Sequence, residues 1–223
     1  VLNELADARA GLLAMLFPDV AATRFDAAQI DDHLGVGITP SVVLMNPPFS
    51  AVANVGRRMA DAALRHISSA LARLADGGRL VAITGASCAP DNPTWRDAFV
   101  GLQQRGQVVF SAAIDGAVYA KHGTTMDTRL TVIDKRAADD PRVFPASPGV
   151  APDVATLLGW VAKFVPSRLP VSLPQAVPSK VRSGPSIGRA QKAAAARPSS
   201  VTAKASQAEA IELAYQTLDW KPV

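Results

Sequence analysis

The fold is decided by residues 41–49, which read SVVLMNPPF. Residues 41–45 form a compact apolar run, and such a run bounded by turn-forming residues predicts a short strand. Asn46, Pro47 and Pro48 follow, and the prolines end the strand because they lack an N–H group and fix φ. Since ligands bind at the carboxyl ends of strands in open α/β sheets, this turn is a candidate binding site.

The turn carries the groups needed to hold a planar amine. The side-chain oxygen of Asn46 and the carbonyl of Pro47 can accept both hydrogens of an exocyclic amine. Accepting them draws the nitrogen toward tetrahedral geometry and frees its lone pair from the ring. Phe49 can stack on the flat group, which contributes ~1–3 kcal/mol for a nucleobase. The motif therefore indicates a planar amine acceptor, but it does not distinguish which planar group bears that amine.

Around this turn, short apolar runs alternate with helical patterns. Strands are predicted at residues 1–4, 20–25, 41–45, 79–84, 107–114 and 128–134. Helices are predicted at residues 5–17, 27–34, 54–76, 94–105 and 153–165. Strands separated by helices predict an α/β fold with a mostly parallel sheet covered on both faces. The strands at 107–114 and 128–134 are close enough in sequence to pair antiparallel.

The motif resembles that of the N6-adenine methyltransferases in the class I S-adenosylmethionine-dependent superfamily. In that family an (Asp/Asn)-Pro-Pro-(Tyr/Phe) motif follows the fourth strand and holds the target amine. The resemblance covers roughly residues 1–136 and implies a Rossmann-like class I methyltransferase fold with a reversed last strand. It implies catalytic roles for Asn46, Pro47, Pro48 and Phe49.

The resemblance also implies S-adenosylmethionine as the cofactor. Glu4, with Leu5 beside it, ends the second strand, where the family places an acid on the ribose hydroxyls. Asp26 and Ala27 follow the third strand, where the family contacts the cofactor's adenine, and Asn46 completes this set. Both carboxylates in this set have structural alternatives. Glu4 can be a favourable acid at a helix N-terminus, and Asp26 can cap a helix.

One feature of the family is missing from this pattern. The glycine-rich loop that wraps the methionine part of the cofactor would precede Val1. We therefore expect an N-terminally truncated domain that is inactive by itself, although the full-length protein is an enzyme. The motifs follow the unpermuted order of the family: first Glu4, then Asp26 with Ala27, then the Asn-Pro-Pro-Phe motif.

The activity that the resemblance implies is methyl transfer to the N6 amine of adenine in DNA, with no metal. Lys121 and His122 lie in a polar loop near where such enzymes admit substrate, and together with Phe49 they are the candidate substrate-binding residues. The alternatives are a methylase of another planar amine, guanine N2 in RNA or protein glutamine, and a non-catalytic methylase-fold scaffold that positions DNA.

A narrower resemblance concerns large bacterial proteins that join an adenine-methylase-like domain to a strawberry notch-type helicase. It rests on the long helix after the motif and on residues 117–134 and 212–220. We accordingly expect a C-terminal extension with one helix at 137–165, a Pro/Ala/Ser-rich basic linker at 166–207, and the start of a following domain at 208–223. The implied partners are DNA and a helicase domain of the same polypeptide.

The charge distribution separates the expected domain from the expected linker. The net charge of +4 arises from 23 Lys and Arg against 19 Asp and Glu. Residues 1–165 hold 15 Lys and Arg against 16 Asp and Glu, whereas residues 166–223 hold 8 against 3. The basic excess lies in the tail, so it neither supports nor weakens a nucleic-acid site in the domain.

Several classes of protein are excluded by composition. One cysteine, Cys88, excludes an intramolecular disulfide framework, and the dispersed His33, His66 and His122 show no zinc-ligand spacing. His66 and Cys88 are expected to be structural. No apolar run approaches the ~18–20 residues of a membrane helix, and the N-terminus lacks the basic start of a signal peptide. We expect no membrane partner and a cytoplasmic location in a bacterium, associated with the nucleoid or a mobile element.

Overall fold

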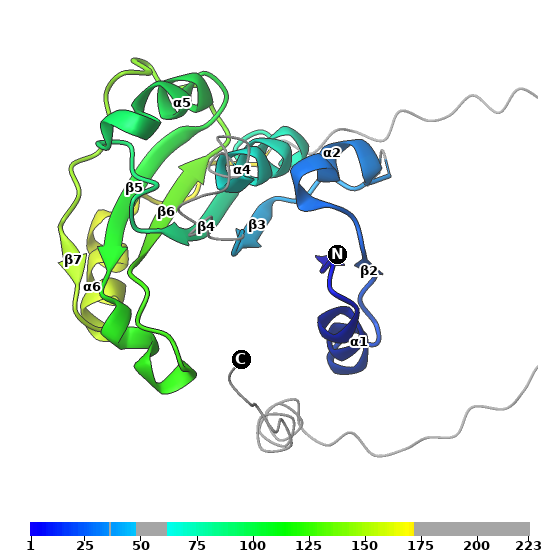
Figure 1. Ribbon diagram of the computed structural model, residues 1–223. Coiled ribbons are helices and arrows are strands. Elements are labelled where there is room, and N and C mark those ends of the chain that lie inside the picture. The colour runs from blue at the N-terminus through cyan, green and yellow to red at the C-terminus, as the bar shows by residue number, and fades with distance from the viewer. Residues whose placement is uncertain (36, 48–61, 172–223) are drawn as a thin grey trace, which may run out of the picture. The chain divides into compact units, whose positions relative to one another are not determined.

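The computed structural model describes residues 1–35, 37–47 and 62–171 (Figure 1). The chain divides into two units, Val1–Pro174 and Gln175–Val223, and all described residues belong to the first. The expected start of a following domain at 208–223 lies outside the described residues, as does most of the expected linker. The domain boundaries therefore stay predictions.

The described strands form two sheets. The smaller sheet pairs β1 (Leu2–Asn3) with β2 (Ala22–Thr23) in parallel. The larger sheet has the order β3-β4-β6-β5-β7. Its members are β3 (Val42–Met45), β4 (Arg79–Gly85), β5 (Gln107–Ile114), β6 (Thr128–Asp134) and β7 (Val150–Ala151). Neither β1 nor β2 is hydrogen-bonded to the larger sheet, so the expected sheet is divided in the described chain.

Within the larger sheet, β6 runs against its neighbours. It pairs antiparallel with both β4 and β5, while β3 is parallel to β4 and β7 is parallel to β5. The antiparallel pairing expected for the strands at 107–114 and 128–134 is confirmed, and so is an α/β fold whose strands are otherwise parallel. Strand β7 was not predicted, because two residues carry no periodicity that sequence inspection can detect.

The helices follow most of the predicted ranges. They are α1 (Asp7–Leu16), η1 (Ala27–Gln29), α2 (Ile30–His33), α4 (Ala62–Arg73), α5 (Pro93–Gln103), η2 (Gly116–His122) and α6 (Val154–Phe164). The helix expected at 27–34 is a 3₁₀ turn followed by one α turn. Residues 54–61 of the expected long helix lie outside the described residues. The strand expected at 20–25 is reduced to Ala22–Thr23, since only these residues pair with β1.

Helices α4 and α5 cover one face of the larger sheet. Ile67 and Leu71 of α4 and Phe99 of α5 pack against Leu80 of β4 and Ile133 of β6, and none of these five side chains is more than 1% exposed. Full burial of such side chains contributes roughly 1.5–3 kcal/mol each. This cluster is the main core of the described unit.

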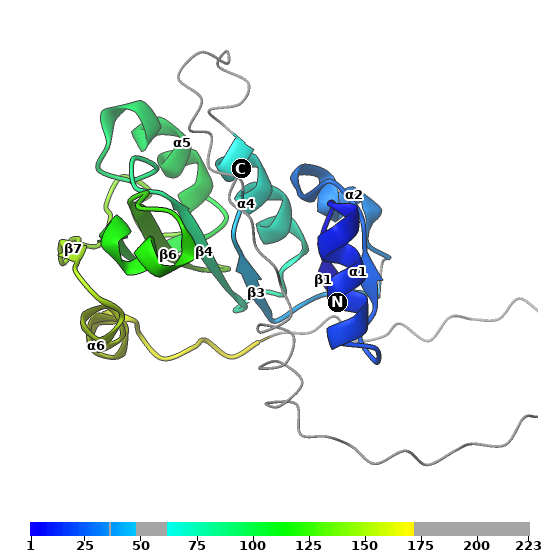
Figure 2. The same ribbon diagram turned by 60° about the horizontal axis from the view of Figure 1, so that its bottom comes forward.

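Helix α6 covers part of the opposite face. Its residues Leu157 and Trp160 pack against Phe110 of β5 and Val132 of β6. Figures 1 and 2 show α6 across the sheet from α4 and α5. Helices therefore lie on both faces of the sheet, as the alternation of strands and helices predicted, while Val42 and Leu44 of β3 remain 39% and 77% exposed.

Helix α4 also ties the N-terminal segment to the larger sheet. The hydroxyl of Ser69 accepts a hydrogen bond from the N–H of Asp31 at 3.2 Å and donates to its carboxylate. Arg73 Nη2 donates to the carbonyl of Leu34 at 2.8 Å. The N–H of Ala75, just past the helix, donates to the carbonyl of Pro40 at 2.8 Å.

The chain after α6 returns to the beginning of β3. Arg168 Nη2 donates to the carbonyl of Ser41 at 3.0 Å. Pro170 passes over Gly77, which has a φ of 77° and where a Cβ atom would collide with the Pro170 carbonyl. Glycine is thus required at position 77 both by its left-handed backbone and by the close approach. None of the helices in the described residues is long and apolar enough to cross a bilayer.

A buried ion pair joins β4 to β6, and removing half of it tests its contribution. Arg79 Nε lies 2.6 Å and Nη2 lies 2.9 Å from the two carboxylate oxygens of Asp134. Asp134→Asn leaves the guanidinium without its counter-charge, so the free energy of unfolding should fall by about 3 kcal/mol in urea denaturation. Asp139→Asn is the matched control, because its side chain is 97% exposed, and it should change stability by less than about 0.5 kcal/mol. Equal effects of the two variants would contradict the assignment.

Cys88 provides a second test of the core. Its side chain is buried, and burial raises the pKa of the thiol to about 11. Since the thiolate is the reactive form, iodoacetamide at pH 8 should leave the native protein unmodified and modify it fully in denaturant, as measured by intact mass. Rapid and complete modification of the native chain would show that Cys88 is not enclosed.

Candidate functional site

The carboxyl end of β3 carries the motif predicted to bind a ligand. Asn46 follows the last residue of this strand and is exposed, whereas Pro47 is buried. Met45 pairs with Ala82 of the neighbouring β4, so Asn46 lies near the end of that strand too. A buried proline beside an exposed polar side chain makes a stiff turn that presents an acceptor to solvent. Pro48 and Phe49 lie outside the described residues, and their predicted roles stay predictions.

The connection between β5 and β6 lies at the same edge of the larger sheet. It leaves the carboxyl end of β5 and contains η2, whose first turn is capped by Asp115 through the N–H of Ala117 at 2.8 Å. The N–H of Gly116 donates to Asp127 Oδ1 at 2.8 Å, and a Cβ at Gly116 would collide with the carbonyl of Thr125. The loop is therefore closed tightly on itself.

Lys121 and His122 are exposed in the last turn of η2. Because β6 runs opposite to β3, β4 and β5, this turn and Asn46 occupy one edge of the sheet. In the same helix, the hydroxyl of Tyr119 shares a hydrogen bond of 3.0 Å with that of Thr128 at the start of β6. The polar loop expected between these strands is thus a short 3₁₀ helix that presents two basic side chains.

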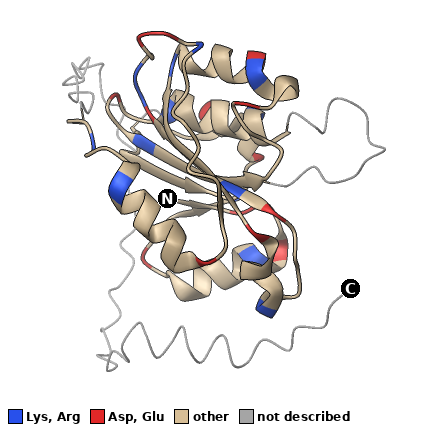
Figure 3. Cartoon of the chain, turned by 90° about the vertical axis from the view of Figure 1, so that its left-hand side faces the viewer, with Lys and Arg blue, Asp and Glu red and all other residues tan. Residues whose placement is uncertain are grey.

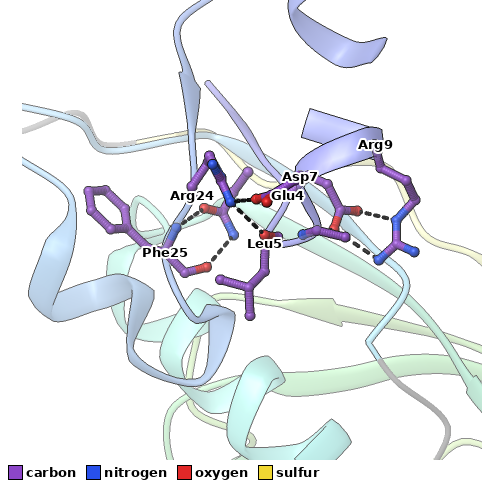
Figure 4. Close-up of polar contacts among 8 residues, drawn as sticks. Glu4, Leu5, Asp7, Arg9, Arg24 and Phe25 are labelled. Atoms are coloured by element: carbon purple, nitrogen blue, oxygen red, sulfur yellow. Dashed lines mark hydrogen bonds and ion pairs between the residues drawn. The ribbon is translucent and has the colours of Figure 1, made fainter. Parts of the chain in front are cut away.

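Glu4 lies at the carboxyl end of β1, where its carboxylate is clamped by Arg9 (Figure 4). Arg9 Nε and Nη2 donate to the two carboxylate oxygens at 2.9 Å each, and the N–H of Ala6 donates to Oε1 at 2.8 Å. These hydrogen bonds, chiefly those from Arg9, hold the pKa of Glu4 below its usual range. Glu4 is therefore an ionised acceptor, and its bond to Ala6 places the carboxylate beside the N-cap residue of α1, the location that its structural alternative requires.

Asp26 follows β2 and caps η1. Its Oδ1 accepts a hydrogen bond from the N–H of Ala28 at 2.9 Å, so the capping alternative is confirmed. The Asp26 side chain stays 56% exposed, and His66 Nε2 of α4 lies 3.9 Å from Oδ1. Burial lowers the pKa of His66, while the nearby Asp26 opposes that shift. Ala27 begins η1 and is half-buried.

Polar side chains that the sequence did not single out shape the ends of β1 and β2. Asn3 bridges the two strands, donating to the carbonyl of Phe25 and accepting from its N–H, both at 3.0 Å. Arg24 pairs with Asp7 and donates to the carbonyl of Leu5 at 3.4 Å (Figure 4). Arg9 is another polar side chain that the sequence did not single out. A basic residue five positions after an acid, as Arg9 is after Glu4, does not by itself indicate an ion pair.

The predicted site residues thus fall into two groups. Glu4, Leu5, Asp26 and Ala27 lie where paired parallel strands end, and Leu5 is 58% exposed. Asn46 lies with Lys121 and His122 at one edge of the larger sheet. In the ranges that the structure describes, no hydrogen bond or ion pair joins a site residue of one group to one of the other, and no group of three or more His, Cys, Asp or Glu side chains could hold a metal ion.

No protein-family model and no curated protein matches the chain. Among solved structures it is similar to a chain from Listeria monocytogenes assigned as a class I S-adenosylmethionine-dependent methyltransferase, with a TM-score of 0.51, 11% identity, and coverage of 73% of this chain and 53% of that one. It is also similar to a chain from Vibrio vulnificus YJ016 assigned as the modification subunit of a type I restriction enzyme. There the TM-score is 0.50 and the identity 13%, with coverage of 75% of this chain and 41% of that one.

The chain thus spans about half the length of the first of these proteins and about two fifths of the second. At such identities the similarity shows the fold alone. The described sheet has one reversed strand, β6, among otherwise parallel strands, with helices on both faces. The chain has the Rossmann-like fold of the class I methyltransferases.

Proposed function

We propose that the chain is part of an S-adenosylmethionine-dependent methyltransferase that acts on the N6 amine of adenine in DNA. The observation that carries this proposal is the turn at the carboxyl end of β3. There Asn46 is exposed and Pro47 is buried, in a class I methyltransferase fold. An exposed amide oxygen on a stiff turn at this edge suits the recognition of a planar amine.

The residues at the ends of β1 and β2 fit the proposed cofactor. A carboxylate offers about four acceptor positions, and Glu4 uses three of them for Arg9 and Ala6. Oε2 accepts only one of these three bonds, and the side chain is 22% exposed, so a hydroxyl group can reach it. Since the pKa of Glu4 is lowered, the carboxylate is ionised and suited to a ribose hydroxyl. Leu5, Asp26 and Ala27 would flank the sugar and the base.

The proposed mechanism needs little from the protein beyond positioning. When bound, S-adenosylmethionine would supply a methyl group made electrophilic by its sulfonium, and would leave as the neutral thioether. Asn46 Oδ1 and the Pro47 carbonyl accept the two hydrogens of the target amine, which turns the nitrogen lone pair away from conjugation with the ring. Phe49 stacks on the base. The surplus proton leaves the amine for water after transfer, so no side-chain base is required.

DNA is the proposed acceptor because the base-holding turn and two basic side chains, Lys121 and His122, share one edge of the sheet. A target base must leave the double helix to reach Asn46, at a cost of a few kcal/mol. We further propose that a helicase domain follows in the same polypeptide, in a bacterial cytoplasm near the nucleoid or a mobile element. That part rests on the sequence resemblance of the long helix after the motif, of residues 117–134 and of residues 212–220.

Asn46→Ala tests the assignment of the amine site. Removing the acceptor oxygen should lower the methylation rate by about 10²-fold or more, with cofactor affinity changed much less. Asn46→Asp is the control, because it keeps an acceptor oxygen and should retain measurable activity. The measurement is transfer of radiolabelled methyl by the complete gene product, followed by nucleoside analysis of DNA and RNA.

The outcomes of this experiment separate the alternatives. Label in N6-methyladenine of DNA supports the proposal, whereas label in RNA guanine or in protein glutamine would assign a different amine. Full activity of Asn46→Ala would remove Asn46 from the mechanism. Cofactor binding without transfer to any acceptor would favour a non-catalytic scaffold.

Glu4→Gln tests the cofactor assignment separately. The substitution keeps the shape but removes the charge, and should weaken S-adenosylmethionine binding by roughly ten-fold, because hydrogen bonds to charged groups are the stronger ones. Asp7→Asn is the matched control, since it removes an exposed carboxylate from the adjacent helix. Titration calorimetry on the complete gene product gives the affinities. Equal affinities of Glu4→Gln and the unmodified protein would contradict the ribose contact.

A further inference from the structure

A pocket of about 430 Å³ lies on the α5 side of the larger sheet, outside the residues assigned so far. Its floor is formed by Ser111 of β5 and Arg129 of β6, and its walls by the loop after β4 and by residues 142–147. Three arginines and one carboxylate line it, namely Arg96, Arg129, Arg142 and Asp91. The formal charge of this lining is therefore +2.

Arg129 is the unusual member of the lining, because it is only 8% exposed. Its Nε donates to the carbonyl of Ala86 at 3.1 Å and its Nη1 donates to the hydroxyl of Ser111 at 3.1 Å. No hydrogen bond of Nη2 and no ion pair with a carboxylate occurs within the described part of the chain. The carboxylate of Asp91 in the same lining acts on this guanidinium electrostatically but forms no ion pair with it. With two further arginines in the lining, the free Nη2 donors fit an anion supplied from outside.

The wall of the pocket is fixed in place by contacts across the fold. Gln103 of α5 is fully buried, and its Nε2 donates to the carbonyls of Pro141 and Val143 at 2.9 Å each. Arg96 Nη2 donates to the carbonyl of Arg142 at 3.2 Å, and its guanidinium lies 5.6 Å from the centre of the Phe144 ring. The pocket is therefore preformed, which lowers the entropic cost of binding a ligand.

The pocket also lies close to the proposed amine site. Arg129 pairs with Thr84 near the carboxyl end of β4, and Met45, which precedes Asn46, pairs with Ala82 of the same strand. Strands β3 and β6 flank β4, so their backbones are about 10 Å apart. A nucleic-acid strand has one phosphate per ~3.4 Å of rise. The phosphates next to a base held at Asn46 therefore lie within about 10 Å of it, the distance that separates β3 from β6.

We propose that this pocket is a phosphate-binding site that holds a backbone phosphate of the nucleic acid beside the target nucleotide. Arg129 supplies a fixed guanidinium, Ser111 its orienting hydroxyl, and Arg142 an exposed charge at the mouth. The identity of the nucleic acid rests on the proposed function, whereas the phosphate chemistry rests on the pocket alone.

Fluorescence anisotropy with a labelled single-stranded oligonucleotide tests this site without any cofactor. Arg142→Gln should weaken binding roughly ten-fold and reduce the slope of log Kd against log salt by about 0.7, the value for one phosphate on a single strand. Arg136→Gln is the matched control, because it removes an exposed guanidinium beyond the opposite end of β6 and should change Kd by less than about two-fold.

Arg129→Lys examines the buried position while keeping its charge. This variant should weaken oligonucleotide binding as much as Arg142→Gln does, because an ammonium group cannot reproduce the forked donors of a guanidinium. Circular dichroism checks that the variant is folded. If it does not fold, Arg142→Gln decides the question. A thermal-shift titration with inorganic phosphate forms the second arm.

Each outcome bears on the site in a defined way. Loss of both oligonucleotide and phosphate binding in Arg142→Gln, but not in Arg136→Gln, supports it. Phosphate binding that depends on Arg142, with unchanged oligonucleotide affinity, overturns the nucleic-acid source. Equal effects of the two variants, or none, overturn the pocket. Since no methyl transfer is measured, failure here is distinct from failure of the proposed enzyme activity.

Discussion

Strand β6 is hydrogen-bonded along both edges, to β4 and to β5, and the rest of the described unit depends on this double pairing. The side chains of β6 enter both helical layers, with Ile133 in the core under α4 and α5 and Val132 in the cluster under α6. The buried Arg79–Asp134 pair fixes its register against β4 at one end. Without this strand, β3 and β4 would be separated from β5 and β7.

The direction of β6 also determines what meets at the functional edge. A reversed strand begins where its parallel neighbours end, so Arg129 and the β5–β6 connection lie at the carboxyl ends of β4 and β5. A strand in the same direction as its neighbours would begin at the other edge. The topology thus brings Asn46, the basic turn of η2 and the arginine pocket to one side of a sheet that has few charges on its strands (Figure 3). In the region 1–165 the carboxylates slightly outnumber the cations, so local placement rather than net charge creates a basic site.

Sequence periodicity was sufficient for the elements that are long and continuous. The strands at 107–114 and 128–134 have the predicted limits, because each is rich in residues that favour strands and follows a glycine or an aspartate. The helix expected at 94–105 begins at Pro93, and the cap supplied by Asn92 is visible in the sequence as a polar residue before proline. Strand β2 is shorter than predicted, because only two residues find a partner in β1.

The parts that could not be predicted depend on contacts between distant residues. The arginine pocket needs Gln103 to hold a segment 38 residues away, and the sequence contains no local sign of that contact. Arg129 lies within the strand predicted at 128–134, but only the pairing of β5 with β6 shows that it meets Ser111. The clamp of Arg9 on Glu4 is of the same kind. The roles predicted for Pro48 and Phe49 lie outside the described residues.

The return of the chain after α6 has a consequence for connectivity. Arg168 touches Ser41, 127 residues earlier, so the segment that contains the larger sheet begins and ends at nearly the same point. Units whose ends lie close together tolerate circular permutation and insertion into other chains, because the host needs to open by only a short distance. The larger sheet with its helices is therefore built as a transferable module, which could be carried between polypeptides without rearranging the strands that form its site.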